Sequence, residues 1–355
     1  MNTTGRQAST VYIRRGLRRI LCLIAFLPAA LIRDAVAAPP AETSGGWVKY
    51  RDNPVLGGQY GVCFDVCVLR ERSAASSSLA PIPSPLAPSY RMWLSWRPKQ
   101  SVAIVDSNDG FHWNGPPRIV LGPRKETGWE DEINRPVVVR RGDNYHMWYT
   151  GQAGGHSAIG YATSSDGIAW KRMSDHPVLA PDQPWEKMAL MCPHVIWDEQ
   201  AKQFRMWYSG GEQYEPDAIG YATSPDGLSW TKSKSNPIFA PDPQLPWEHH
   251  KVTAVQVIKR ADDYLMFYIG FRDTAHAQIG VARSKDGITH WQRHSANPIV
   301  RATGGDAWDA DACYKPFAIF DGQKWLLWYN GRRGGVEQIG VVTHEGEDLG
   351  FGPWR

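Results

Sequence analysis

Apolar and polar residues alternate in short runs along most of the chain, and one such pattern occurs twice. It reads IGYATSSDGIAW at residues 159–170 and IGYATSPDGLSW at residues 219–230, so the second copy begins 60 residues after the first. Alternating runs rich in β-branched and aromatic residues predict half-buried strands. The Asp-Gly pairs inside them predict tight turns, because glycine tolerates the positive φ that hairpins require. The two copies are therefore predicted to be equivalent strand-and-turn units.

A second motif shows that the unit occurs more than twice. The segments WYTG, WYSG, FYIG and WYNG begin at Trp148, Trp207, Phe267 and Trp328, with spacings of 59, 60 and 61 residues, and a weaker copy begins at Trp93. Each unit contains four short strand-like runs. Four antiparallel strands repeated about every sixty residues are typical of a propeller blade. The sequence therefore predicts an all-β fold, a five-bladed β-propeller of four-stranded antiparallel blades.

The two ends of the repeated region complement each other. Residues 47–56, WVKYRDNPVL, match residues 230–239, WTKSKSNPIF, whereas the last unit stops without such a segment. We expect the N-terminal strand to complete the last blade, because closure leaves no sheet edge exposed. The prediction is a single closed propeller domain over residues 46–355, with a Ser/Ala/Pro-rich insertion at residues 73–88 in its first blade.

The beginning of the chain differs in composition from the repeats. Arginines at positions 14, 15, 18 and 19 precede the apolar run ILCLIAFLPAALI at residues 20–32, and Ala35 and Ala37 fit the small-residue pattern of a signal-peptidase site. The run is too short to cross a bilayer comfortably. Residues 1–37 are therefore predicted to be a secretory signal peptide, with an uncleaved membrane anchor as the alternative. The mature protein is expected to be secreted or periplasmic.

The positive charge of the chain belongs to this segment. Its removal takes away six arginines and one aspartate, so the formal net charge changes from +3 to −2. A chain without a basic excess gives no reason to expect a nucleic-acid partner. We expect no membrane contact after signal cleavage, and a monomer.

Four cysteines remain in the mature chain, Cys63, Cys67, Cys192 and Cys313. Their spacing matches neither a small-domain disulfide framework nor a zinc motif, so they are predicted to be buried small hydrophobic residues. No phosphate-binding loop, dinucleotide motif or catalytic Ser-His-Asp order is present. No cofactor and no metal are expected.

Tryptophan is abundant and mostly follows the repeat. Thirteen of the 17 tryptophans fall at repeated positions, and Trp96, Trp197, Trp325 and Trp354 do not. Tryptophan is a frequent platform for sugar rings, but a residue that recurs in every unit is predicted to pack between blades.

The combination of five units, the MWYSG and IGYATSPDG motifs and the NPVL segments resembles the five-bladed glycoside hydrolase superfamily, with its arabinanases, xylosidases, invertases, levansucrases and mannoside phosphorylases of families 43, 32 and 130. The resemblance implies a carbohydrate substrate in a central channel. It also implies three carboxylates on the innermost strands of the first three blades, acting as a base or nucleophile, a pKa-tuning aspartate and a glutamic acid.

Only one of the three carboxylates is present at its expected position. Asp65, in CFDVCVL, stands at the place of the first, Arg135, in NRPVVV, replaces the second, and Met191, in MCPHVIW, occupies the place of the acid. Glycosidic cleavage needs one group that donates a proton and another that attacks or activates water. Because a thioether cannot donate a proton, either another carboxylate has taken the acid role or the site does not hydrolyse.

Other carboxylates precede the innermost strands. Several of them recur directly after a tryptophan, and this predicts a structural role: Glu130, Glu186, Glu248 and Asp309. Glu132 and Asp311 fall outside that series and are the better candidates for the acid. The catalytic candidates are therefore Asp65, Glu132 and Asp311.

The loops between the second and third strands of each blade are expected to surround the channel mouth. Together with the innermost strands, they supply the predicted substrate-binding residues: Arg135, Met191, His194, Lys315, His156, Glu215, Arg272, Asp273 and Arg332. Arg135 and Lys315 each precede a proline, in the register of Asp65. Two cations there favour a ligand that carries a carboxylate or sulfate, unless they only neutralise Glu132 and Asp311.

Two hypotheses follow for function. The first is a secreted glycoside hydrolase-like protein acting on a glycan in the channel, with Asp65 as base or nucleophile and Glu132, Asp311 or Glu215 as acid. The alternative is a non-catalytic propeller that binds a carbohydrate or another partner. A carboxyl group about 5 to 10 Å from Asp65 across an open channel would favour hydrolysis.

Overall fold

The computed structural model describes residues 42–71 and 89–354. The predicted signal peptide, residues 1–37, and the predicted insertion, residues 73–88, lie outside the described residues. No helix in the described ranges is long and apolar enough to span a membrane. The regular structure consists of strands, with short 3-10 turns at Gly58–Tyr60, Arg97–Lys99, Lys125–Thr127 and Pro184–Glu186.

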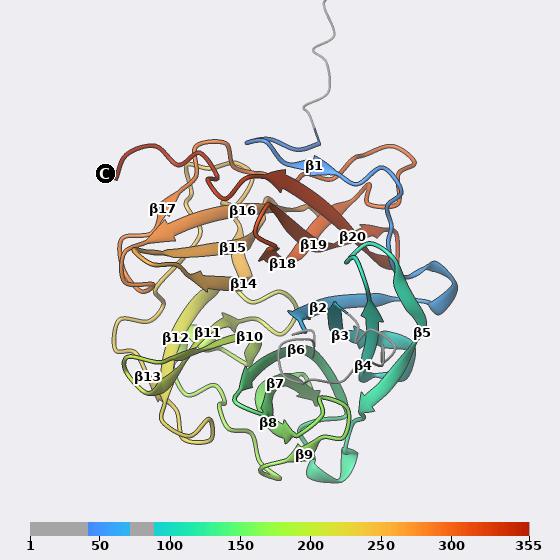
Figure 1. Cartoon of the computed structure of the whole chain (residues 1–355). Helices are drawn as coiled ribbons and strands as arrows, with labels where there is room; N and C mark the ends of the chain where they lie inside the picture. Colours follow the sequence, from blue (N-terminus) through green and yellow to red (C-terminus); the bar gives the residue numbers. More distant parts are fainter. Residues whose placement is uncertain (1–41, 72–88, 355) are drawn as a thin grey trace, which may run out of the picture. The chain divides into compact units, whose positions relative to one another are not determined.

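The strands form antiparallel meanders that follow the predicted units (Figure 1). Their bounds are β2 Cys63–Arg70, β3 Tyr90–Trp96, β4 Ser101–Ser107, β5 Trp113–Leu121; β6 Glu132–Arg141, β7 Asn144–Ala153, β8 His156–Ser164, β9 Lys171–Arg172; β10 Ala189–Asp198, β11 Gln203–Gly211, β12 Ala218–Ser224, β13 Thr231–Lys232; β14 Lys251–Lys259, β15 Tyr264–Phe271, β16 Ala277–Ser284, β17 Gln292–Arg293; β18 Ala312–Phe320, β19 Lys324–Arg333, β20 Val336–Glu345 and β1 Val48–Lys49.

The N-terminal strand joins the last meander, as its sequence predicts. Val48 and Lys49 of β1 pair antiparallel with Thr343 and Val342 of β20. The sheet order is β1-β20-β19-β18. Two other meanders, β6–β9 and β10–β13, share one eight-stranded sheet through a parallel bridge between β8 and β10.

A repeated hydrogen bond joins neighbouring meanders. The indole N–H of Trp93 donates to the carbonyl of Gly167 at 3.0 Å, and that of Trp148 to Gly227 at 3.1 Å. The bonds from Trp207 to Gly287 and from Trp328 to Gly110 are equivalent. These four indoles are fully buried. The prediction that the repeated tryptophans pack between units is confirmed for this series.

The first strand of each meander contains the same bulge. At one position in each of β2, β6, β10, β14 and β18, the register shifts and a non-glycine residue adopts a positive φ. The residues and their φ angles are Asp65 (53°), Arg135 (55°), Cys192 (51°), Ala254 (45°) and Lys315 (55°). A bulge re-aims the side chain that it contains. The five residues therefore hold equivalent places in the fold.

Hydrogen bonds between meanders hold four of these bulges. The N–H of Arg135 donates to Ser95 Oγ at 2.8 Å, and the N–H of Cys192 donates to Thr150 Oγ1 at 3.1 Å. In the same way, the Asp65 N–H donates to Asn330, and the Ala254 N–H donates to Ser209. In each case the acceptor lies on the second strand of another meander, so the bulge geometry is built by the scaffold.

Candidate active site

The five bulge residues line one cavity, which we call the inner cavity. Its wall is completed by the residues that follow them, including Pro136, His194, Val255 and Phe317. The volume is about 50 Å³. A cavity of that size has room for a few water molecules and is too small for a sugar ring.

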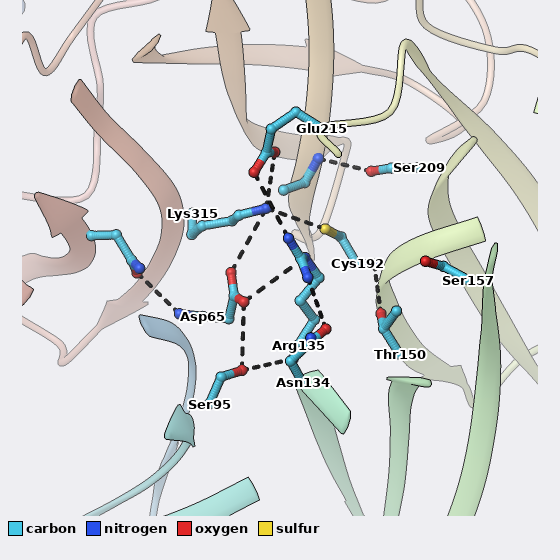
Figure 2. Close-up of polar contacts among 12 residues, drawn as sticks. Asp65, Ser95, Asn134, Arg135, Thr150, Ser157, Cys192, Ser209, Glu215 and Lys315 are labelled. Carbon is cyan, nitrogen blue, oxygen red and sulfur yellow. Dashed lines mark hydrogen bonds and ion pairs between the residues drawn. The ribbon is translucent and has the colours of Figure 1, made fainter. Parts of the chain in front are cut away.

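Four charged groups meet beside this cavity (Figure 2). Lys315 Nζ lies 3.7 Å from Asp65 Oδ1 and 3.1 Å from Glu215 Oε2. Arg135 lies 3.8 Å from each of the same two carboxylates, through Nε to Asp65 and through Nη2 to Glu215. Cys192 Sγ is 3.5 Å from Lys315 Nζ. We call Asp65, Arg135, Glu215 and Lys315 the charge cluster.

The protonation states in the charge cluster follow from its mixed signs. Burial raises the pKa of Glu215, but Lys315 and Arg135 outweigh it and hold the pKa of this carboxyl below its ordinary value. Burial by itself lowers the pKa of Lys315, and the neighbouring acidic groups raise it above the ordinary value. Burial also raises the pKa of the Cys192 thiol. Glu215 is therefore an anion at neutral pH, and Lys315 is a cation.

The two carboxylates flank the same ammonium group. Since Asp65 Oδ1 and Glu215 Oε2 lie 3.7 and 3.1 Å from Lys315 Nζ, they are at most 6.8 Å apart (3.7 plus 3.1 Å). This upper limit overlaps the range of about 5 to 10 Å for a glycosidase pair. However, cations occupy the space between them, and Glu215 is ionised, so Glu215 does not meet the requirements for the predicted acid.

A second, larger cavity, the polar cavity, adjoins Arg135. Its volume is about 260 Å³, and Arg135 lines both cavities. The wall contains carboxylates, amides and two aromatic rings, from Phe64, Arg97, Asp131, Glu132, Asn134, Gln152, Ala153, Gly154, Gly155, Gln213 and Tyr214. The side chain of Tyr214 is 75% exposed. Polar groups beside an exposed aromatic ring are suited to a sugar, which has hydroxyls at its edge and C–H groups on its face.

The structure separates the remaining catalytic candidates. Glu132 lines the polar cavity. Asp311 lines neither cavity, and its Oδ2 accepts a hydrogen bond of 2.7 Å from the Gly334 N–H, which holds the β19–β20 turn. Asp311 therefore has a structural contact in place of the predicted catalytic one.

The predicted binding residues on the first strands have different surroundings. His194 lines the inner cavity, with Nε2 2.9 Å from the Val257 carbonyl, and burial lowers its pKa to about 4. Met191 is fully buried in an apolar cluster with Ile269 and Tyr314 and lines neither cavity. The structure thus gives Met191 a packing role, because its side chain is enclosed by other apolar groups.

The predicted loop residues lie outside both cavities. Asp273 accepts a hydrogen bond of 3.2 Å from Arg272 Nε, and its Oδ1 is 2.8 Å from Nδ1 of His276. Arg332 donates to the carbonyl of Ala275, and His156 is exposed at the start of β8. Of the loop residues predicted to bind substrate, the structure brings Glu215 to Arg135 and Lys315.

Sequence reasoning missed Glu337 and the amides of the polar cavity. Glu337 Oε1 lies 3.3 Å from the Arg97 guanidinium, and within residues 42–71 and 89–354 its buried Oε2 meets no hydrogen-bond partner. Burial raises the pKa of Glu337, Arg97 opposes this, and the charge of Asp65 adds to it. The segment GGVEQIG contained this residue, but nothing in its pattern separated it from an exposed loop acid.

The four described cysteines are free and buried, as predicted. In the ranges that the structure describes, no group of three His, Cys, Asp or Glu residues is close enough to hold a metal ion.

Comparisons with known proteins agree with this architecture. The model of the glycosyl hydrolases family 32 N-terminal domain matches residues 94–258. An uncharacterized protein of Mycobacterium tuberculosis is 29% identical over 276 residues, which covers 72% of this chain and 88% of that protein. The β-1,2-mannobiose phosphorylase of Thermoanaerobacter is 28% identical over 140 residues, covering 35% of this chain and 44% of the enzyme.

One similar solved structure is the β-1,2-mannobiose phosphorylase of Listeria innocua with bound β-1,2-mannobiose. It has a TM-score of 0.60 and 14% identity, and the match covers 84% of this chain and 96% of that one. The resemblance to the propeller glycoside hydrolases is confirmed. The chain has an all-β, glycoside hydrolase-like fold of antiparallel four-stranded units.

Proposed function

We infer that the antiparallel meanders are the five blades of one closed propeller over residues 46–355. Two observations support this inference. The indole bond from Trp328 to Gly110 links the last meander to the first. In addition, Lys49 of β1 pairs with the buried Asp309 at 2.7 Å, as Arg172, Lys232 and Arg293 of the other short fourth strands pair with the equivalent acids.

The function that the site supports best is recognition of a carbohydrate in the polar cavity. The inner cavity is too small for a sugar, whereas the polar cavity has a volume of about 260 Å³ and combines amides, charged groups and the exposed ring of Tyr214. The Listeria innocua phosphorylase, which has a similar fold, is in complex with β-1,2-mannobiose. The ligand would lie on Tyr214 with its hydroxyls toward Asn134, Gln152 and Arg135.

One observation favours binding over ordinary hydrolysis. Asp65 and Glu215 are held around the same ammonium of Lys315, and Glu215 is kept ionised. Hydrolysis requires a proton donor and a second carboxylate with the sugar between them. Two carboxylates separated by a cation provide neither the donor nor the space.

Calorimetric titration of the mature protein with a panel of neutral and acidic oligosaccharides tests this function. Tyr214→Ala should weaken binding of the best ligand at least tenfold, because the ring supplies the apolar face of the site. Trp354→Ala, which removes an exposed ring outside the polar cavity, should leave affinity unchanged. Absence of binding across the panel, or equal affinity in wild type and Tyr214→Ala, would contradict the proposal.

A second candidate function, glycoside cleavage, is favoured by one group. The raised pKa of Glu337 makes it a better proton donor than Glu215. Glu337 pairs with Arg97, and Arg97 lines the polar cavity together with Glu132. If aryl glycosides are turned over, Asp65→Asn should reduce turnover by about 10² to 10⁴. Undiminished turnover would remove Asp65 from the mechanism.

We also propose that the protein is exported and that residues 1–37 are removed. N-terminal sequencing of protein from the culture medium or periplasm should give Ala38 as the first residue. Recovery of the intact chain in a membrane fraction would support the anchor alternative.

A further inference from the structure

Arg135 is nearly enclosed, yet much of its hydrogen-bonding capacity is unused. The residue is 9% exposed. Its Nη1 donates to Asn134 Oδ1 at 2.8 Å, while Nε has no hydrogen-bond partner among the residues that the structure describes. The contacts with Asp65 and Glu215, at 3.8 Å, are too long for hydrogen bonds. A guanidinium in this state can still bind a planar anion through two parallel hydrogen bonds.

Glu215 differs from the other members of the charge cluster because it lies on a loop. Asp65, Arg135 and Lys315 belong to first strands, whereas Glu215 lies between β11 and β12 and has a φ of 55°. Its side chain is 27% exposed, against 9% for Arg135 and 4% for Lys315. Figure 2 shows its carboxylate directed at Lys315 and Arg135. Glu215 therefore covers two cations that the strands hold in place.

Ion pairs near the surface fix this loop to the neighbouring strand. Lys251 Nζ lies 2.9 Å from Glu212 Oε2 and donates to the Glu215 carbonyl at 3.0 Å. Lys187 Nζ lies 2.6 Å from Asp217 Oδ2. Lys187, Glu212 and Asp217 are partly exposed, so their contacts are individually weak and are screened by salt, whereas Lys251 is buried. The loop is thus attached by groups that can be released without unfolding a strand.

We propose that Glu215 is an internal stand-in for an acidic group of the ligand, so that the natural ligand is a sugar bearing a carboxylate or sulfate. The acidic group of the ligand would displace Glu215 and bind Arg135 and Lys315 from the polar cavity. Without Glu215, the charge cluster keeps two cations and Asp65, a net charge of +1, which attracts an anion. This inference rests on the proposed carbohydrate-binding function.

The test compares wild type with Glu215→Gln, which keeps the shape of the side chain and removes its charge. Calorimetry would measure methyl glucuronide, glucose 6-sulfate, methyl glucoside and inorganic sulfate. We expect the variant to bind at least one acidic sugar ten or more times as tightly as wild type, with affinity that falls as salt rises. Affinity for methyl glucoside should not change. The preferred acidic sugar identifies the group as carboxylate or sulfate.

Glu199→Gln is the matched control, because Glu199 is a carboxylate that pairs with exposed Lys202 and takes no part in the cluster or in the contacts of the Glu215 loop. It should not reproduce the gain in affinity. Thermal unfolding would show that both variants are folded. An equal gain for neutral and acidic sugars, or no gain for any anion, would overturn the inference while leaving the proposed function intact. A gain for inorganic sulfate with no sugar bound by any variant would support the anion site and overturn the carbohydrate function.

Discussion

Two sets of buried carboxylates in this protein relate differently to the sequence repeat. One set recurs after a tryptophan in successive units, and each member accepts a hydrogen bond from a tyrosine and pairs with a cation of the short outer strand. We call these the repeated pairs; they contain Glu130, Glu186, Glu248 and Asp309. The other set is Asp65 and Glu215; the position of Asp65 recurs in every unit, but no other unit has a carboxylate there. Recurrence marks the carboxylates that join the strands within each unit, and departure from the repeat marks the candidate site.

The bulge position shows why Asp65 is free to carry function. The same backbone conformation accommodates aspartate, arginine, cysteine, alanine and lysine, and Ala254 adopts it with no polar side chain. The hydrogen bonds that hold the bulges use the main-chain N–H. The fold therefore determines the backbone of the bulge, and the side chain at the bulge can vary without loss of that backbone conformation.

The largest expected effect comes from removing β1, which supplies the cation of one repeated pair. A chain beginning at residue 57 lacks Lys49 and the buried Trp47, and leaves Asp309 without its ion pair. We expect loss of cooperative folding, because the last sheet would lose a strand and expose its edge. Thermal unfolding of this truncation would be compared with a chain beginning at residue 38. Identical transitions would show that β1 is dispensable and that the last unit is complete without it.

A single member of a repeated pair should matter less than the strand but still strongly. Glu186 is fully buried and lies 2.6 Å from Lys232. Glu186→Ala leaves the Tyr208 hydroxyl without its acceptor and leaves Lys232 with Asp182 and the Ala180 carbonyl alone, so the free energy of unfolding should fall by about 3 kcal/mol. Urea denaturation measures the change. Glu199→Ala, which breaks an exposed pair with Lys202, is the control and should have no measurable effect. Similar values for both would mean that burial does not distinguish the pairs.

The indole bonds between units offer a third comparison. A Cβ at Gly167 would lie 2.9 Å from the Trp93 ring, at a φ of +72°. At Gly142 the φ is +60°, and a Cβ would meet nothing within 4 Å. Gly142→Ala should cost only the backbone strain, about 1 kcal/mol, and Gly167→Ala should cost about 1 to 3 kcal/mol more through the displaced indole. Equal urea midpoints for the two variants would remove the packing contribution.

The repeat explains how much of this architecture could be predicted. Three features are repeated along the chain: the hydrophobic alternation, the Asp-Gly turns and the tryptophans. Because each copy predicts the same local geometry or contact, a single sequence is enough to recognise the strands, turns and packing positions. The same reasoning placed Asp65, Arg135 and Lys315 in one register, and the structure places all three in the bulge. It also assigned structural roles to the acids that follow tryptophan.

The errors concern contacts that occur once. Asp311 was separated correctly from the tryptophan series, yet its carboxylate holds a neighbouring turn. Arg135 and Lys315 were expected to lie beside Asp65 and face an acidic ligand, or else to neutralise Glu132 and Asp311. In the structure they lie beside Asp65, and their second carboxylate is Glu215. A loop that reaches across the fold has no periodic signature, and a pKa set by burial, such as that of Glu337, depends on residues far apart in the sequence.

The smallest expected effect contrasts the pH dependence of the two sets. In the folded protein burial raises the pKa of Glu215, but Lys315 and Arg135 together lower it by more, so the pKa lies below the ordinary value. The charged form of Glu215 therefore stabilises the fold at pH values above the ordinary pKa. This contribution is lost as pH falls through the folded pKa. The pKa of Glu248 is raised by burial, against the opposing effect of Arg293, so the folded state takes up this proton first. Its contribution therefore grows as pH falls from the folded pKa toward the ordinary value.

Urea denaturation between pH 7 and about pH 3 would separate the two behaviours. On acidification, the free energy of unfolding of wild type should fall toward that of Glu215→Gln. Over the same pH range, the free energy of unfolding of wild type should rise relative to that of Glu248→Gln. Parallel pH profiles for the two variants would mean that the repeated pairs and the charge cluster share one electrostatic environment. Opposite slopes would show that burial disfavours the charged form of Glu248, whereas Lys315 and Arg135 keep Glu215 ionised. An ionised Glu215 can be replaced by the acidic group of a ligand.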